Sequence, residues 1–232
     1  MDTVHEHFED EARDFDQVIQ TLIPYYDQML EALVVALPFA PTEPIAVLDL
    51  GCGTGTVTAC VLKAFPNAAV TCLDFSARMV ELARVKLSGY ATVQYVAQDF
   101  RDFAFGDQYD AVVSSLALHH LETDDEKRLF YEKVYRALKP GGCFYNADVV
   151  LGSGESLQAT YLDKWKAFMR KQIPAEEIER KWLPKYRVED HPARLLEQLA
   201  WLTAIGFSEV DVLWKYYNFA VYGGIKSRSR LK

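Results

Sequence analysis

The chain has 232 residues, half of them hydrophobic and a quarter charged, with a formal net charge of −8. This is enough for one well-buried domain with appendages, and the acidic balance argues against nonspecific binding to nucleic acid or to an anionic membrane. No apolar run approaches the roughly 20 residues of a membrane span. We therefore expect no membrane partner and no nucleic-acid partner, although a tRNA bound through a local patch stays open.

The acidic segment 2–16 does not have the pattern of a signal peptide. No Cys-x-x-Cys pair is present, and every cysteine falls in a segment that we expect to be core or loop: Cys52, Cys60, Cys72 and Cys143. Reduced thiols and a cytoplasmic location are therefore the expectation. The sequence leaves open a monomer or a homodimer.

Residues 1–44 are predicted to form helices ahead of the first strand. Two apolar stripes at helical spacing support this prediction: Phe8, Phe15, Val18, Ile19 and Leu22, then Leu30, Leu33, Val34 and Leu37. Pro24 separates the stripes and is followed by Tyr25 and Tyr26.

Strands and helices then alternate over residues 45–150. The predicted strands are 45–50, 70–73, 93–96, 109–114 and 143–150, and the predicted helices include 76–87 and 124–138. Such alternation is typical of right-handed βαβ units and of a parallel sheet covered by helices on both faces. Ser76 is a predicted N-cap, and the Lys-Pro-Gly-Gly turn at 139–142 is expected to end the later helix.

The last third adds a helical insertion, 151–191, and a last helix, 192–205. Two closing strands, 210–214 and 217–221, lie too close together in the chain for a crossover, so they must be antiparallel. We predict a single α/β domain over residues 1–232, with a doubly wound, mostly parallel sheet of seven strands. The N-terminal helices are expected to act as a lid, and the insertion lies between strands five and six.

A glycine-rich loop follows the first strand and leads into a helix, as Asp49-Leu50-Gly51-Cys52-Gly53-Thr54-Gly55. Glycines permit positive φ and close approach of a ligand to the backbone, and free N–H groups at a helix start favour negative charge. The dinucleotide fingerprint needs its third glycine where Thr56 stands. An acid at Asp49 suits a ligand with a positive end better than it suits a pyrophosphate.

This loop resembles motif I, Asp-x-Gly-x-Gly-x-Gly, of the class I S-adenosylmethionine-dependent methyltransferases. Further matches follow in the order of that family: Ala97-Gln98-Asp99-Phe100, Tyr109-Asp110, Ser114-Ser115 and Leu138-Lys139-Pro140-Gly141-Gly142. The resemblance implies a Rossmann-like methyltransferase fold with its cofactor-binding core in residues 45–150. It also implies S-adenosyl-L-methionine as cofactor and S-adenosyl-L-homocysteine as product.

Ligands of doubly wound sheets bind at the carboxyl ends of the strands, so Asp74 is predicted to accept the ribose hydroxyls. An ordinary turn aspartate is the alternative. Phe75 and Met79 are expected to form an apolar wall for adenine, and the resemblance implies that Asp99 accepts the adenine amino group. The residues predicted to bind the cofactor are Tyr26, Asp49, Gly51, Cys52, Gly53, Gly55, Asp74, Phe75, Met79, Asp99, Phe100 and Ser115.

Three further residues are candidates for catalysis: His119 and His120 after the fourth strand, and Asp148 in the fifth. Both segments end at the edge of the sheet where the glycine loop lies, so their side chains can converge. A hydroxyl acceptor must lose its proton, best to a base that titrates near neutrality. Some small-molecule and sugar O-methyltransferases have a similar His-His pair with a strand-five aspartate. Packed or helix-capping histidines are one alternative, and a metal bound by these three residues is another; we predict no metal.

The ends of the chain resemble the carboxy-S-adenosylmethionine synthases that serve tRNA wobble-uridine modification. The matching segments are Pro24-Tyr25-Tyr26, Ala175-Glu176-Glu177-Ile178 and Tyr217-Asn218-Phe219. Those synthases have the methyltransferase fold and carboxylate the cofactor with prephenate, and the match implies that Tyr26 and Ser115 touch the cofactor. They hold the new carboxylate with an arginine at the position of Trp201, and an indole has no fixed positive charge.

We therefore predict an S-adenosylmethionine-dependent methyltransferase that acts on a small-molecule acceptor, by in-line transfer with a histidine as general base. A synthase-like enzyme and a non-catalytic cofactor-binding protein are the alternatives. Five aromatic residues are expected either to line the mouth of the pocket or to be plain inter-helix core: Tyr25, Tyr26, Trp165, Trp182 and Tyr186. No pattern identifies the acceptor, because acceptor choice lies in the least patterned segments.

Overall fold

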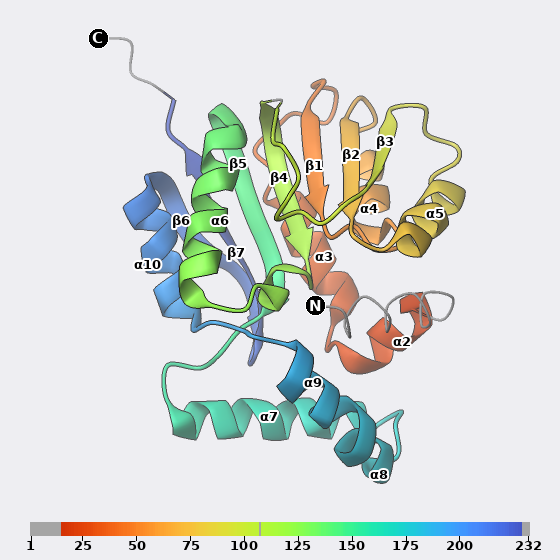
Figure 1. The fold of residues 1–232 in the computed structure, drawn as a ribbon, viewed down its shortest axis with the longest axis vertical. Helices are drawn as coiled ribbons and strands as arrows, with labels where there is room; N and C mark the ends of the chain where they lie inside the picture. The colour runs from red at the N-terminus through yellow and green to blue at the C-terminus, as the bar shows by residue number, and fades with distance from the viewer. Residues whose placement is uncertain (1–14, 107, 229–232) are drawn as a thin grey trace.

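A seven-stranded sheet organises the chain, which the computed structural model describes over residues 15–106 and 108–228. The part of the predicted N-terminal helices that falls in residues 1–14 lies outside the described residues. The strand order is β3-β2-β1-β4-β5-β7-β6 (Figure 1). The strands are β1 (Ala46–Leu50), β2 (Ala69–Asp74), β3 (Val93–Ala97), β4 (Tyr109–Ser115), β5 (Leu138–Val149), β6 (Phe207–Tyr216) and β7 (Phe219–Lys226).

Strands β1 to β5 are parallel, and β7 runs antiparallel to both of its neighbours, β5 and β6. This confirms the predicted doubly wound, mostly parallel sheet and its antiparallel closing pair. The winding reverses between β1 and β4, which are neighbours although β2 and β3 lie on the far side of β1. A ligand of such a sheet binds in the crevice at that reversal.

Helices cover both faces of the sheet, and the central strands β1 and β4 are therefore apolar and buried along most of their length. Within β1, Val47 belongs to one core cluster while Leu48 and Leu50 belong to the other. The helices around the sheet are α3 (Tyr26–Val35), α4 (Thr56–Ala64), α5 (Ala77–Lys86), α6 (Asp124–Ala137) and α10 (Leu195–Ile205). Among the described helices, none combines the length and apolar character that crossing a bilayer requires.

The remaining helices gather beyond the carboxyl ends of the parallel strands (Figure 1). They are α2 (Phe15–Leu22), α7 (Glu155–Met169), α8 (Ala175–Glu177), a π-helical turn (Ile178–Trp182) and α9 (Leu183–Glu189). A short 3₁₀ helix (Leu118–His120) follows β4. The indole N–H of Trp165 on α7 donates to the carbonyl of Leu22, 2.7 Å away, so the insertion is fixed to α2. The predicted helical character of residues 151–191 is confirmed.

Some boundaries differ from the predicted ones. The Lys-Pro-Gly-Gly turn lies inside β5, where a register shift opposite Tyr109 and Ala111 admits it to the ladder. The last helix begins at Leu195 and not at residue 192, because Leu151 donates its N–H to the carbonyl of Ala193 and keeps that segment extended. Strands β6 and β7 are each longer than predicted.

Candidate active site

The glycine loop forms one wall of a cavity of about 790 Å³ at the reversal point of the sheet. Gly51 and Gly53 have φ values of 68° and 53°, in the left-handed region that favours glycine. A Cβ atom on Gly51 would lie 2.3 Å from the Cβ of Ala117. The loop can therefore approach the chain that leaves β4 only with glycine at this position.

Ten of the twelve predicted cofactor residues line this first cavity. They are Tyr26, Gly51, Cys52, Gly53, Asp74, Phe75, Met79, Asp99, Phe100 and Ser115. The Oγ atom of Ser115 is buried and has no hydrogen-bond partner among the described residues. Because buried hydroxyls are normally paired, this atom suits a polar group of a bound ligand.

Asp49 and Gly55 do not line the cavity, contrary to expectation. Gly55 is the N-cap of α4 and has a φ of 82°. Its Cα packs against the end of α5, since a Cβ atom added there would lie 2.8 Å from Leu87 Cδ1. Asp49 is fully buried, and its Oδ2 accepts a hydrogen bond from Thr58 Oγ1 at 2.6 Å. Burial raises the pKa of Asp49 to about 7. Both residues thus make their contacts on the side of the loop that faces away from the cavity.

Asp74 lines the cavity and braces the loop at the same time. Its Oδ2 accepts from the N–H of Gly53 and its Oδ1 from the N–H of Ser76, each at 2.9 Å. Ser76 in turn caps α5, as predicted, by accepting from the N–H of Met79. The carboxylate therefore ties the glycine loop to the start of the next helix while lying at the edge of the cavity.

Asp99 has a partner that the sequence did not predict. Arg101 places Nη2 2.6 Å and Nε 3.0 Å from Asp99 Oδ2. Against the effect of its burial, these hydrogen bonds hold the pKa of Asp99 below its usual range. The predicted acceptor for the adenine amino group is thus an ionised carboxylate held by a guanidinium.

A second cavity, of about 830 Å³, adjoins the first. Phe15, Leu116 and His120 line both cavities. The second is bounded by α2, by the insertion and by the ends of β5 and β7. Of the predicted aromatic residues, Trp165, Trp182 and Tyr186 line it, and Tyr26 lines the first.

Tyr25 lines neither cavity. Its side chain is 46% exposed and packs edge-on against Tyr216, with ring centroids 4.8 Å apart. The reason is local: Tyr25 has φ of 54° in the turn that starts α3, and this turns it away from its neighbour Tyr26.

Leu116 separates the two cavities in a strained conformation. Its φ is 53°, which costs a leucine about 1–2 kcal/mol. The N–H of Leu116 donates to the carbonyl of Ala147 at 2.9 Å, so the chain is held to β5 as it leaves β4. Strain of this kind collects at functional sites, and here it lies at the junction between the cavities.

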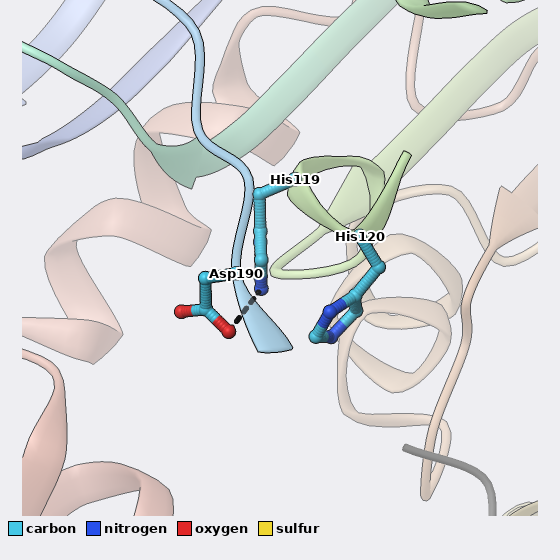
Figure 2. A group of neighbouring side chains, drawn as sticks. All are labelled: His119, His120 and Asp190. Carbon is cyan, nitrogen blue, oxygen red and sulfur yellow. Dashed lines mark ion pairs between the residues drawn. The ribbon is translucent and has the colours of Figure 1, made fainter. Parts of the chain in front are cut away.

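His119 is fixed between two carboxylates. Its Nδ1 lies 2.5 Å from Asp148 Oδ1, and its backbone N–H donates to Asp148 Oδ2 at 3.1 Å. Its Nε2 lies 3.6 Å from Asp190 Oδ1 (Figure 2). Burial opposes a charged ring, but Asp148 and Asp190 outweigh it and raise the pKa of His119 to about 9. The expected convergence of His119 and Asp148 is confirmed, and the ring is an imidazolium at neutral pH.

His120 is the neutral member of the pair. Its Nδ1 lies 3.1 Å from the carbonyl oxygen of Glu189, which can only accept, so Nδ1 carries the hydrogen and Nε2 has the lone pair. Burial and the positive charge of His119 lower the pKa of His120 below its ordinary value. Figure 2 shows this ring beside His119, and the two ring centroids are 4.1 Å apart.

Donor atoms of His119, His120 and Asp190 lie within 4.8 Å of one another, a grouping that could hold a metal ion. Metal ligands of this type lie about 2.0–2.2 Å from the ion. Both ring nitrogens of His119 already face carboxylates.

Sequence reasoning missed Leu116, Lys185, Glu189 and Asp190. The last three lie in the insertion, where no motif links them to the histidines, and only the Glu-Asp pair at its end is a weak signal. Trp201, by contrast, lies on α10 against the second core cluster and lines neither cavity. Within this chain, the residue at position 201 does not discriminate between the two predicted activities.

Comparisons with known proteins agree with this geometry. Residues 47–142 match a model of a methyltransferase domain. The chain is 28% identical over 219 residues to the carboxy-S-adenosyl-L-methionine synthase of Shewanella halifaxensis, covering 91% of this chain and 88% of that protein. It is 31% identical over 119 residues to a malonyl-[acyl-carrier protein] O-methyltransferase of Priestia megaterium, covering 51% of this chain and 42% of that protein.

Among solved structures, the DhpI–SAH complex matches with a TM-score of 0.64 and 23% identity, over 97% of this chain and 95% of the DhpI chain. At this identity the match shows the shared fold. The methyltransferase-domain match spans the glycine loop and the strands whose ends form the first cavity. These comparisons support the resemblance of the chain to the class I S-adenosylmethionine-dependent methyltransferases.

Proposed function

We propose that this enzyme transfers the methyl group of S-adenosylmethionine to a small-molecule acceptor in the second cavity. One observation carries the proposal: the first and second cavities adjoin and share Phe15, Leu116 and His120. When bound, the cofactor supplies an electrophilic methyl group on a sulfonium. In-line transfer needs the acceptor positioned against that group, and the shared wall is a suitable meeting point.

The first cavity offers the cofactor a polar side and an apolar side. Asp74 would accept from ribose hydroxyls, and the other polar side chains of the wall include Asp99 and Ser115. Phe75, Met79 and Phe100 would supply apolar surface for adenine. These assignments use the cavity lining together with the family resemblance of the motifs.

His120 is the proposed general base. The lone pair on its Nε2 would take the hydroxyl proton of the acceptor as the oxygen bonds to the methyl group. Its lowered pKa keeps the imidazole ring uncharged at neutral pH, at some cost in driving force for proton transfer. His119, held by Asp148 and Asp190, would act as a fixed positive neighbour.

A synthase that carboxylates the cofactor is the second candidate, because the similarity to those synthases extends over most of both chains. A carboxylate beside the sulfonium needs a cation to hold it. Among the described residues that line the first cavity there is no arginine or lysine. Lys185 lines only the second cavity. The lack of a cationic side chain in the described lining of the first cavity favours methyl transfer over carboxylation of the cofactor.

Mass spectrometry separates the two candidates. With S-adenosylmethionine and prephenate, we expect no product that is heavier than the cofactor by CO2. With methyl-labelled S-adenosylmethionine and a panel of hydroxyl compounds, we expect S-adenosylhomocysteine and label on the acceptor in equal amounts. A carboxylated cofactor would reverse the ranking, and cofactor binding without any turnover would favour a non-catalytic protein.

A further inference from the structure

We propose that an aromatic strip on the surface of the protein binds single-stranded nucleic acid. The strip consists of five rings and three lysines: Tyr25, Tyr161, Phe168, Tyr216, Tyr217, Lys164, Lys171 and Lys215. None of these residues lines either cavity. The inference is therefore independent of the proposed methyl transfer.

The five rings approach one another in a single series. Tyr25 lies between Phe168 and Tyr216, with ring centroids 6.4 Å and 4.8 Å away. Tyr217 lies between Tyr216, at 4.8 Å, and Tyr161, at 5.9 Å. Three of these four contacts are edge-to-face, and in such a contact one ring keeps both of its faces out of the contact. Tyr25 is 46% exposed and the other rings are half-buried, so the series lies at the surface.

Three separate segments bring these rings together. Tyr161, Lys164 and Phe168 share one face of α7, because they are spaced three and four residues apart. Tyr25 precedes α3. The end of β6 and the turn into β7 contribute the remaining two tyrosines. The strip is thus a product of the tertiary fold.

Two of the tyrosines have a backbone conformation that tyrosine rarely adopts. The φ angle is 54° at Tyr25 and 50° at Tyr217, in the region that disfavours bulky side chains. Tyr217 begins a two-residue turn between β6 and β7, where glycine or asparagine normally supplies the positive φ. Strain of this kind collects at functional sites, so these two tyrosines support a function for the strip.

Each lysine of the strip places its ammonium group over one of the rings. The distances from Nζ to the ring centroid are 4.2 Å for Lys215 over Tyr161, 5.5 Å for Lys171 over Phe168 and 5.8 Å for Lys164 over Tyr217. Among the described residues, these lysines form no ion pair with an acidic side chain. Their positive charges therefore stand beside the rings without a neutralising carboxylate.

Acidic side chains are few around the strip. Within three positions of its members in the sequence, the acids are Asp27 and Asp163, and Arg170 is a further cation. Asp163 lies two residues after Tyr161 on α7, which turns it by about 200° to the opposite side of the helix. The strip is therefore a positively charged surface on a chain of net charge −8.

Rings and cations in one strip match the two parts of a single-stranded nucleic acid. Its bases stack on aromatic side chains, and its phosphates pair with cations. A second copy of the chain would bring lysines against lysines, and protein interfaces are poor in lysine. An anionic membrane is bound by apolar side chains that insert below the headgroups, whereas four of the five rings here carry a hydroxyl. The chemistry therefore favours an unpaired nucleic-acid strand.

Fluorescence anisotropy with the full chain and a labelled oligouridylate of about twelve nucleotides tests the inference. We expect a dissociation constant of roughly 10⁻⁴–10⁻⁶ M at about 0.1 M salt, and a slope of log K against log salt of about −2 for three neutralised phosphates. Polyglutamate of equal charge, added as a competitor, cannot stack and should bind at least about tenfold more weakly. RNA that does not bind, polyglutamate that binds as tightly as the RNA, or binding only to vesicles of phosphatidylcholine and phosphatidylserine would overturn the inference.

Tyr217→Asn and Tyr25→Asn each remove a ring and keep a residue that accepts positive φ. We expect each variant to weaken RNA binding at least about fivefold, with an unchanged salt slope, because a stacked base loses its platform. Tyr90→Asn removes an exposed tyrosine outside the strip and should bind as the parent does. RNA binding that is unchanged in both strip variants, or that Tyr90→Asn lowers equally, would overturn the assignment of the strip.

Lys164→Gln tests the charges separately from the rings. We expect it to make the salt slope shallower by about 0.7, the contribution of one phosphate contact to a single strand. Lys63→Gln, which changes an exposed lysine on α4, is the matched control and should keep the slope of the parent. An unchanged slope in Lys164→Gln, or an equal change in Lys63→Gln, would mean that the phosphates do not lie on the strip and would overturn the inference.

Discussion

The Nδ1 atom of His119 lies 2.5 Å from Oδ1 of Asp148, and both side chains are buried. This contact gives the two adjacent histidines different chemistry. His119 holds a proton because carboxylates face both of its nitrogens. That positive charge, added to burial, keeps His120 neutral at the wall shared by the two cavities. The arrangement makes His120 the better candidate for a base, and the following predictions depend on it.

Replacing Asp148 should release the proton of His119. Burial lowers the pKa of His119, and Asp148 and Asp190 together raise it to about 9. Asp148→Asn removes one of the two carboxylates, so the pKa of the ring should fall towards or below its ordinary value. Nitrogen-15 NMR titration of the imidazole measures this directly. The exposed Asp125→Asn is the control. A His119 pKa that stays near 9 in Asp148→Asn would mean that Asp190 alone holds the proton.

The same contact makes the stability of the protein depend on pH. The pKa of His119 is raised in the folded state to about 9, against about 6.5 in an unfolded chain. Its contribution to the free energy of unfolding is therefore fully present below about pH 6.5 and is lost as the pH rises through 9. Denaturant titrations across this window should show a decline in the parent that is smaller in Asp148→Asn. Parallel pH profiles for the two proteins would contradict the assignment.

The pH dependence of methyl transfer should identify the base. If His120 takes the proton, the rate should be level from about pH 6.5 upwards, because its pKa lies below the ordinary histidine value. A rise through the ordinary histidine range, the simpler expectation from sequence, would fit an unperturbed ring. A rise centred near pH 9 would assign the base to His119.

Asp74→Ala should weaken cofactor binding by about 1–3 kcal/mol, since the ribose would lose a charged acceptor. The glycine loop and the start of α5 would also lose the hydrogen bonds from Gly53 and Ser76. Calorimetry should therefore show a lower cofactor affinity, and thermal unfolding should show a lower melting temperature. Normal affinity with a lowered melting temperature would leave Asp74 with a bracing function only.

The polar contacts of Asp16 with Lys86 and Thr54 should limit the mobility of α2. Lys86 Nζ lies 2.6 Å from Asp16 Oδ2, and the hydroxyl of Thr54 in the glycine loop donates to Asp16 Oδ1 at 2.5 Å. We expect Asp16→Asn to speed hydrogen exchange in α2 and to raise the KM for the cofactor. Glu81→Gln, which removes the surface pair with Arg84 on α5, should have little effect. Unchanged exchange in Asp16→Asn would show that apolar packing alone holds the helix.

Local patterns predicted the sheet and most of the first cavity. Asp74 and Ser115 end strands, and the position of a strand end at the reversal point follows from alternation and from the glycine loop. Gly55 and Asp49, which were predicted to bind the cofactor, do not line the first cavity, because residue spacing does not reveal which side of a tight loop faces a neighbouring helix. Gly55 faces Leu87, which is a tertiary contact.

The second cavity could not be predicted in the same way. Asp190 reaches His119 from the far end of an insertion, and no periodicity or motif relates the two segments. The neutral state of His120 depends on the carbonyl of Glu189 and on the charge of His119, both of which are products of packing. The position of Trp201 outside the lining of both cavities likewise depends on the placement of α10.

A single-turnover experiment with methyl-labelled S-adenosylmethionine and a hydroxyl compound that the parent methylates, comparing the parent with His120→Ala, tests the central claim most directly. The account predicts label on the acceptor oxygen and one S-adenosylhomocysteine for each methyl transferred. It also predicts a rate lower by roughly 10²–10⁴-fold in His120→Ala, with cofactor affinity unchanged. Transfer by His120→Ala within about threefold of the parent, a margin far below the contribution expected of a general base, would contradict it, as would a cofactor that gains the mass of CO2 with prephenate.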